Sequence, residues 1–259
     1  MADFLDTLAR NTLSTIAEGY YNNPTNGKRS LRRLSESIVE FDQTAIITEV
    51  KFASPTLKTI GTDLSIESLA TSMEAGGAVG ISVLTEPKHF MGTLSDFTKV
   101  RRQVKLPLLM KDVFLNRDQV DAASTIGADA VLLIQALYDR AYCECTLEEM
   151  IDYAHSKGLE VLLETHDSTE FESAMNTTAD LIGINNRDLR TLKVDLNNTK
   201  TILHKKDVKD RVVVSESGIK TKADIQFLLK AGARAFLIGS AIMKANDVEQ
   251  KVRELVSTL

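Results

Sequence analysis

Two opposite charges stand at the end of an apolar run in the stretch IITEVKFASP, residues 46 to 55. Side chains alternate along a β-strand, so Ile47, Glu49 and Lys51 would share one face of this strand. A carboxylate and an ammonium group on one face of a buried strand either lie in water or line a site. In a site, such a pair could hold a substrate anion and transfer protons.

Four more apolar runs end in ionisable or amide side chains. The residues concerned are Lys111, Glu164, Asn185 with Arg187, and Ser215, Glu216 and Ser217. A buried charge without a partner costs several kcal/mol, so five coincident cases indicate mutual pairing or a bound ligand. Two lysines and two carboxylates around one opening can supply a general acid, a general base and an anion clamp.

The last two apolar runs end in small residues, Ser217-Gly218 and Gly239-Ser240. Such residues let backbone N–H groups approach an anion closely. A single turn of this kind is explained by glycine relieving steric crowding. Two turns in succession favour a phosphate site after the last two strands.

These side chains need a scaffold that brings the ends of distant strands together. Beyond residue 44 the sequence repeats a short run rich in Val, Ile and Leu, a polar loop and an amphipathic helical stretch. The predicted strands are residues 44 to 51, 79 to 85, 107 to 111, 129 to 135, 159 to 165, 180 to 185, 211 to 217 and 235 to 240. Eight apolar strands separated by helices predict an α/β fold, a closed (βα)8 TIM barrel; a doubly wound open sheet is the alternative.

Helical stretches lie between several of these strands. The clearest are residues 65 to 77, 116 to 128, 146 to 158 and 221 to 233, with Gly76, Gly127, Gly158 and Gly232 as C-terminal caps. Residues 1 to 43 do not follow the repeat. They predict an N-terminal helical extension, broken at Asn23 to Gly27 and packed on a barrel domain of residues 44 to 259.

Composition excludes several classes of protein. The chain has 259 residues, 43% of them hydrophobic and 26% charged, and a net charge of -5, so it has no bulk attraction to nucleic acid or to an anionic membrane. Its start is unlike a signal peptide, and no run approaches the roughly 20 apolar residues that span a bilayer. Cys143 and Cys145 are too few for a zinc site, and we expect reduced thiols in a cytoplasmic protein.

Taken together, the polar strand ends resemble those of indole-3-glycerol phosphate synthases. The matching stretches, in family order, are EVKFASP (49 to 55), SVLTEPKHFMGT (82 to 93), LLMKD (108 to 112), LLETHD (162 to 167), GINNRDL (183 to 189), SESGI (215 to 219) and LIGSAIM (237 to 243). The resemblance implies ring closure, decarboxylation and dehydration of 1-(2-carboxyphenylamino)-1-deoxy-D-ribulose 5-phosphate in tryptophan biosynthesis. It implies no metal and no organic cofactor, and it leaves other enzymes of the pathway as expected partners.

The resemblance also implies roles for five charged or amide side chains. Lys111 would be the general acid that protonates the substrate carbonyl. Lys51 would pair with the anthranilate carboxylate and act as a second proton donor. Glu164 and Glu49 would position the amine and handle protons, while Asn185 would hold substrate hydroxyls.

Further residues would bind the substrate. Arg187 would help to fix the carboxylate, Ser217 would assist at the sugar, and Phe90 would form an aromatic wall. The implied phosphate cradle is Ser54, Gly218, Gly239 and Ser240. No role is implied for His89 or His166, which we interpret as packed or loop residues.

The chain departs from the family pattern at two places. Thr56-Leu57 stands where Ser-Gly is familiar, and Val113 precedes Phe114 where Phe usually follows Lys-Asp. Two other functions remain open from the residues alone. One is a sugar-phosphate enzyme such as phosphoribosylanthranilate isomerase, and the other is a non-catalytic barrel that binds a phosphorylated ligand.

The two lysines are expected to differ in their pKa values. Lys51 stands beside Glu49, which would keep it protonated. Lys111 follows an apolar run alone, so the sequence predicts a pKa lowered toward the working pH by an apolar environment.

Overall fold

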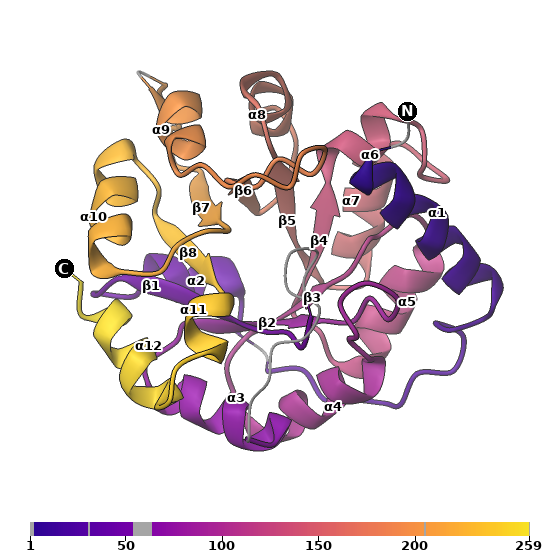
Figure 1. Ribbon diagram of the computed structural model, residues 1–259. Coiled ribbons are helices and arrows are strands. Elements are labelled where there is room, and N and C mark those ends of the chain that lie inside the picture. Colours follow the sequence, from indigo (N-terminus) through magenta and orange to yellow (C-terminus); the bar gives the residue numbers. More distant parts are fainter. Residues whose placement is uncertain (1–2, 31, 54–63, 205, 259) are drawn as a thin grey trace.

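The chain forms a closed barrel of eight parallel strands (Figure 1). The computed structural model describes residues 3–30, 32–53, 64–204 and 206–258. The strands are β1 (Ala45–Val50), β2 (Gly80–Leu84), β3 (Leu108–Lys111), β4 (Ala130–Ile134), β5 (Glu160–Thr165), β6 (Leu181–Asn185), β7 (Val212–Glu216) and β8 (Ala235–Ile238). Strand β1 pairs with both β2 and β8, which closes the barrel. The predicted TIM barrel is confirmed, and the open-sheet alternative is wrong.

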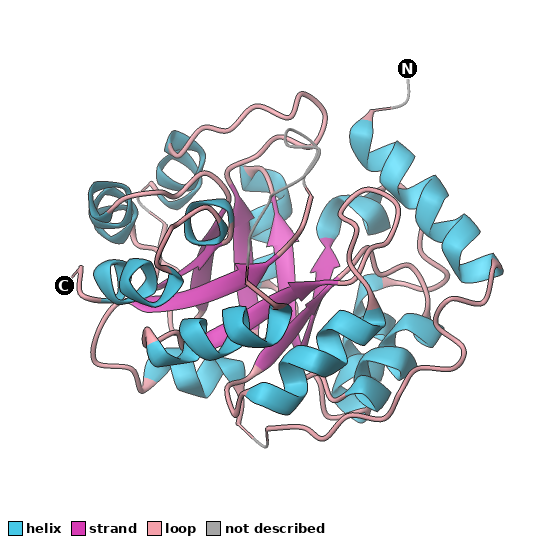
Figure 2. Ribbon diagram, turned by 60° about the horizontal axis from the view of Figure 1, so that its bottom comes forward, coloured by secondary structure: helices cyan, strands magenta, loops and turns pink. Residues whose placement is uncertain are grey.

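Helices cover the outside of the barrel (Figure 2). They are α3 (Ile66–Ala75), α4 (Leu94–Gln103), α5 (Arg117–Ile126), α6 (Gln135–Asp139), α7 (Leu147–Ser156), α8 (Ser168–Met175), α9 (Asn197–Leu203), α10 (Lys222–Ala231), α11 (Ser240–Met243) and α12 (Val248–Val256). Gly127 and Gly232 end α5 and α10 in the left-handed conformation that glycine tolerates best. Within the described part of the chain, no helix is long and apolar enough to cross a membrane.

Alternation along the strands separates two apolar layers. Residues such as Ile46 and Phe236 point outward and pack against the helices. Residues such as Ile47, Leu162 and Val214 point inward and fill the barrel. Because the alternation continues to the ends of the strands, the inward face of each strand also decides which side chain reaches the open end of the barrel.

The N-terminal extension reaches both ends of the barrel. Helix α1 (Phe4–Ala17) lies at the mouth, beside α6, where Leu5 and Leu8 join the apolar layer that includes Ile134 (Figure 1). Helix α2 (Leu34–Val39) lies at the opposite end, where Leu34 approaches Gly80 at the start of β2. The extension therefore contacts both the mouth of the barrel and the opposite end, which we call the closed end.

Candidate active site

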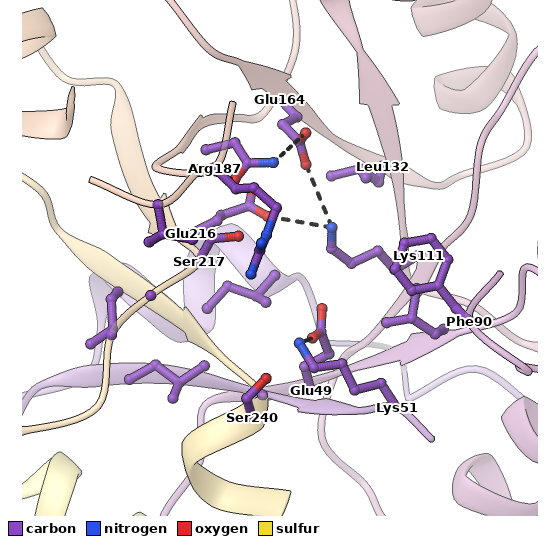
Figure 3. Close-up of a pocket in the computed structure, with 18 of the residues that line it drawn as sticks. Glu49, Lys51, Phe90, Lys111, Leu132, Glu164, Arg187, Glu216, Ser217 and Ser240 are labelled. Atoms are coloured by element: carbon purple, nitrogen blue, oxygen red, sulfur yellow. Dashed lines mark hydrogen bonds and ion pairs between the residues drawn. The ribbon is translucent and has the colours of Figure 1, made fainter. Parts of the chain in front are cut away.

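A cavity of about 900 Å³ opens at the carboxyl ends of the strands. Its lining includes these residues singled out in the sequence: Glu49, Lys51, Phe90, Lys111, Glu164, Asn185, Arg187, Ser217, Gly218, Gly239 and Ser240. Figure 3 shows their side chains converging from several strands. Ser54, Thr56 and Leu57 lie outside the described residues.

Lys111 occupies the centre of one wall of this cavity. It is the last residue of β3, and its Nζ lies 3.5 Å from Glu164 Oε2 and 3.6 Å from Glu216 Oε2 (Figure 3). All three side chains point inward because each stands an even number of residues from inward-facing apolar residues of its own strand. The Lys111 ammonium group is therefore held between two carboxylates where the barrel interior meets the mouth.

The predicted lowering of the Lys111 pKa is wrong. Burial by itself lowers this pKa, but the negative charges of Glu164, Glu216 and Glu49 raise it well above its usual value. Lys111 looked isolated in the sequence because these carboxylates are contributed by other strands. Lys111 is consequently a charged group that can donate a proton but is not close to deprotonation at neutral pH.

Glu216 is a candidate functional residue to which the sequence interpretation gave no role. Its carboxyl group is buried, and Oε1 has no hydrogen-bond partner among the described residues. Burial raises its pKa to about 8, against the lowering effect of Lys111, and the neighbouring Glu164 adds to the rise. Alternation in VVVSE could have identified Glu216, since Val214 and Glu216 point inward and Ser215 points outward.

Glu49 and Lys51 form an ion pair on the opposite wall. Lys51 Nζ lies 2.5 Å from Glu49 Oε1 (Figure 3). Burial raises the pKa of Glu49, but Lys51 and Lys111 together bring that pKa below its usual value. Gly239 leaves room for this pair, because a Cβ there would lie against Glu49 Oε1 and the carboxylate would have to move. The sequence interpretation assigned Gly239 to phosphate alone and did not anticipate this packing requirement.

Asn185 connects Glu164 to the loop that follows β6. Its Nδ2 donates to Glu164 Oε1 at 2.8 Å, and its Oδ1 accepts from the Arg187 backbone N–H at 2.9 Å. The Arg187 guanidinium donates to the Leu192 carbonyl and lines the cavity. Asn185 thereby orients Glu164 while Arg187 keeps a cationic group available to a bound anion.

Small residues and lysines meet at the end of the cavity formed by β7 and β8. Ser217 and Gly218 both have positive φ angles, 68° and 84°, and a Cβ on Gly218 would lie 2.3 Å from Val194. A non-glycine residue in this conformation is strained, and such strain is concentrated at functional sites. Three lysines that the sequence interpretation did not single out also line the cavity: Lys220, Lys244 and Lys251.

Phe90 and Val113 both contribute apolar surface to the cavity. Glu86 holds the loop of Phe90 by accepting from the backbone N–H groups of His89 and Phe90 at 2.7 and 3.0 Å. Val113 lines the cavity, whereas Phe114 is buried in the outer apolar layer. His89 contacts Asn11 of α1 at 2.6 Å and is not part of the cavity lining.

Comparison with known proteins gives one consistent family. The family model described as "Indole-3-glycerol phosphate synthase" matches residues 9–255. The chain is 42% identical to the indole-3-glycerol phosphate synthase of Methanocaldococcus jannaschii over 234 residues, covering 88% of this chain and 84% of the relative. It is 35% identical to that of Bacillus cereus (strain G9842), covering 96% of both chains.

Solved structures with similar folds include two other proteins. A thiamine phosphate pyrophosphorylase from Pyrococcus furiosus aligns with a TM-score of 0.60 at 18% identity and covers 87% of this chain and 97% of its own. An N-acetylmannosamine-6-phosphate 2-epimerase from Clostridium perfringens aligns with a TM-score of 0.59 at 14% identity, covering 82% and 91%. At these identities the likeness is one of fold.

Proposed function

The chain belongs to the indole-3-glycerol phosphate synthase family, and we propose that two opposed charged walls at the barrel mouth carry out its reaction. It is a carboxy-lyase of tryptophan biosynthesis. Its substrate, 1-(2-carboxyphenylamino)-1-deoxy-D-ribulose 5-phosphate, is converted to indole-3-glycerol phosphate, carbon dioxide and water. Family membership sets aside the isomerase and the non-catalytic barrel.

Lys111 is the proposed acid for ring closure. The observation that carries this assignment is the position of its ammonium group between Glu164 and Glu216, which keeps Lys111 charged inside the cavity. The aromatic carbon that bears the carboxylate attacks the ketone, a carbon–carbon bond forms, and the carbonyl oxygen takes the lysine proton. A charged donor aimed at the developing alkoxide stabilises this transition state.

Lys51 and Arg187 are the proposed partners of the carboxylate before carbon dioxide leaves. Both line the cavity, and both have basic side chains that can pair with an anion. When the bond to the carboxylate breaks, its electron pair returns to the ring and neutralises the positive charge on the nitrogen. The two cations therefore orient the substrate carboxylate. Carbon dioxide then leaves from the ionised form, without a proton.

Glu164, Glu216 and Glu49 are the proposed proton carriers for dehydration. Loss of the hydroxyl group as water needs one proton donor, and restoration of the indole needs a base for the remaining proton. Glu216 suits the donor role because burial raises its pKa to about 8, so that it can take up and release a proton near neutral pH. Glu164, oriented by Asn185, suits the base role, and Glu49 is the second candidate base.

The phosphate is proposed to lie at the end of the cavity formed by β7 and β8. Gly218, Gly239 and Ser240 line that end, where small residues leave backbone donors accessible. Ser54 is proposed as a fourth member of this cradle. Asn185 and Ser217 would then reach the hydroxyl groups of the sugar chain between the two charged walls.

Product formation tests this assignment directly. The purified chain, mixed with the carboxyphenylamino-deoxyribulose phosphate, should produce indole fluorescence and release one carbon dioxide per indole formed. Phosphoribosylanthranilate serves as the comparison substrate and should give neither change. Absence of indole fluorescence with the carboxyphenylamino-deoxyribulose phosphate would contradict the proposal. Carbon dioxide release that is not accompanied by indole fluorescence would contradict it as well.

Organisation and location are proposed on narrower grounds. We propose that residues 1 to 43 form an extension that serves the barrel domain of residues 44 to 259, supported by the contacts of α1 at the mouth. A cytoplasmic location is supported by the free thiols of Cys143 and Cys145. Other enzymes of tryptophan biosynthesis are the proposed partners.

A further inference from the structure

Two adjacent tyrosines follow α1 and reach the ends of β2 and β3. Their rings pack edge to face, with centroids 4.9 Å apart, and Tyr21 is only 3% exposed. We propose that Tyr21 is a positioning residue, whose hydroxyl acts through Asp112 to fix the direction in which Lys111 leaves β3. This inference rests on the proposed role of Lys111 as the acid.

Asp112 is held by donors from three segments. The Tyr21 hydroxyl donates to Asp112 Oδ2 at 3.0 Å, and the Thr85 hydroxyl donates to the same oxygen at 2.6 Å. The backbone N–H of Val113 donates to Oδ1 at 2.8 Å. Because the carboxylate is 3% exposed, water does not replace these donors readily, and their number fixes its orientation.

The same network holds the backbone on both sides of Lys111. Asp112 is the next residue in the chain, and the Thr85 backbone N–H donates to the Lys111 carbonyl at 3.1 Å. The distances from Lys111 Nζ to Glu164 and Glu216, 3.5 and 3.6 Å, exceed the 2.7 to 2.9 Å of a strong charge-assisted hydrogen bond. The backbone at the end of β3, rather than a tight contact at Nζ, therefore sets where the acid lies.

Tyr20 provides a matched control from the same turn of chain. Its hydroxyl donates to the Thr85 carbonyl at 3.2 Å and accepts from the Leu94 backbone N–H at 3.1 Å, but it makes no hydrogen bond to Asp112. Removal of either hydroxyl deletes one hydrogen-bonded oxygen next to Thr85. Only removal of the Tyr21 hydroxyl deletes a donor to the carboxylate beside Lys111.

Ionisation of Asp112 gives a second readout. Burial raises the pKa of Asp112 to about 6, the hydrogen bonds from Thr85, Val113 and Tyr21 oppose this rise, and the nearby charge of Glu86 adds to it. A donor stabilises the ionised form, so loss of the Tyr21 hydroxyl should raise the pKa further. If ionised Asp112 positions Lys111, the low-pH limb of the plot of kcat against pH should move to higher pH in this variant.

The test compares Tyr21→Phe with Tyr20→Phe in the indole fluorescence assay. For Tyr21→Phe we expect kcat to fall about tenfold with KM within about twofold, because a small displacement of a catalytic group lowers turnover more than binding. The acid limb of its kcat profile should move to higher pH. Tyr20→Phe should keep the kcat and the pH profile of the unmodified enzyme.

A second pair of variants guards against misfolding of Tyr21→Phe. Thr85→Val removes the other hydroxyl donor to Asp112, whereas Thr85→Ser keeps a hydroxyl there and should restore the original profile. Equal losses in Tyr20→Phe and Tyr21→Phe, or an unchanged kcat and pH profile in Tyr21→Phe, would overturn the positioning role. An unmodified enzyme that forms no indole, or a fully active Lys111→Ala, would instead overturn the proposed function and with it this inference.

Discussion

The two ends of the barrel both bury charged side chains, but they satisfy them to different extents. At the closed end, Asp129 accepts from Arg101 Nη1 at 2.9 Å, from the Leu108 N–H at 2.9 Å and from the Ser30 N–H at 3.2 Å. At the mouth, Lys111 lies no closer than 3.5 Å to a carboxylate, and Glu216 Oε1 has no partner among the described residues. Both Asp129 oxygens thus have donors, whereas one Glu216 oxygen has none among the described residues.

Glu160 extends the contrast at the closed end. Its carboxylate accepts from the backbone N–H groups of Leu34 and Ser35, from the Ser35 hydroxyl and from Arg33 Nε. This arrangement caps the N-terminus of α2 and fastens the extension to β5. Carboxylates whose oxygens all accept hydrogen bonds stabilise the fold, whereas incompletely paired carboxylates keep the capacity to bind a substrate and exchange protons.

Replacement of Lys111 should produce the largest effect on activity. Lys111→Ala removes the acid, so turnover should fall by a factor on the order of 10² to 10⁴ while substrate binding changes little. Lys51→Ala should instead weaken binding as well as slow the reaction, because the carboxylate loses a counter-charge. Steady-state kinetics and direct binding measurements check this pair, with thermal melts to verify folding. Normal turnover in Lys111→Ala would contradict the assignment.

Replacement of Asp129 should produce the largest effect on stability. Asp129→Asn leaves the buried Arg101 guanidinium without its counter-charge, which should cost about 3–5 kcal/mol of unfolding free energy. Denaturant unfolding measures this loss. The kcat of the folded fraction should remain unchanged, because the pair lies at the end opposite the cavity. Asp121→Asn, in a solvent-accessible ion pair with Lys157, is the control and should cost much less.

Gly239 offers a smaller perturbation at the mouth. In Gly239→Ala the new Cβ would lie 2.4 Å from Glu49 Oε1 and 3.0 Å from Lys51 Nζ, so the ion pair must move. We expect kcat/KM to fall about tenfold, corresponding to roughly 1.4 kcal/mol of transition-state stabilisation. The same substitution should have less effect in a Glu49→Ala background, where the clash is relieved. Equal effects in both backgrounds would assign the loss to the phosphate end alone.

Among the effects on stability, the smallest should come from Glu216, and it should appear as a dependence on pH. Its folded pKa, about 8, lies above the unfolded value, so its contribution to stability is complete below about pH 4.5 and is lost as pH rises through 8. Glu216→Gln cannot lose a proton. Its stability relative to the unmodified enzyme should therefore increase between pH 5 and pH 9 in denaturant titrations. A difference that does not vary with pH would show that Glu216 does not bind a proton in this range.

Much of the fold and of the site follows from local patterns. Alternation in the β1 run places Ile47 and Glu49 on one face, and the repeated helix and strand pattern predicts the barrel. The predicted strands extend one or two residues beyond the observed ones at several ends. Asp129 and Gly239, for example, lie just outside β4 and β8, although their neighbours continue the apolar runs.

The pKa values of the site residues could not be predicted from such local patterns. The sequence shows Lys111 at the end of an apolar run, yet its pKa is raised because Glu164 and Glu216 approach it from β5 and β7. The left-handed conformation of Ser217 and the space reserved by Gly239 for Glu49 also depend on segments distant in the chain. Coulombic and steric effects act through space, so they depend on distances that strand alternation does not specify.

The sequence alone determined which side chains point into the barrel, because alternation is a local property of the backbone. It also determined the family, through seven short stretches in a fixed order. Closure of the barrel decided the rest: which carboxylates surround Lys111, where Glu216 is left partly unpaired, and how Tyr21 reaches Asp112. These contacts join residues far apart in the chain, and only the register between strands brings them within a few ångströms.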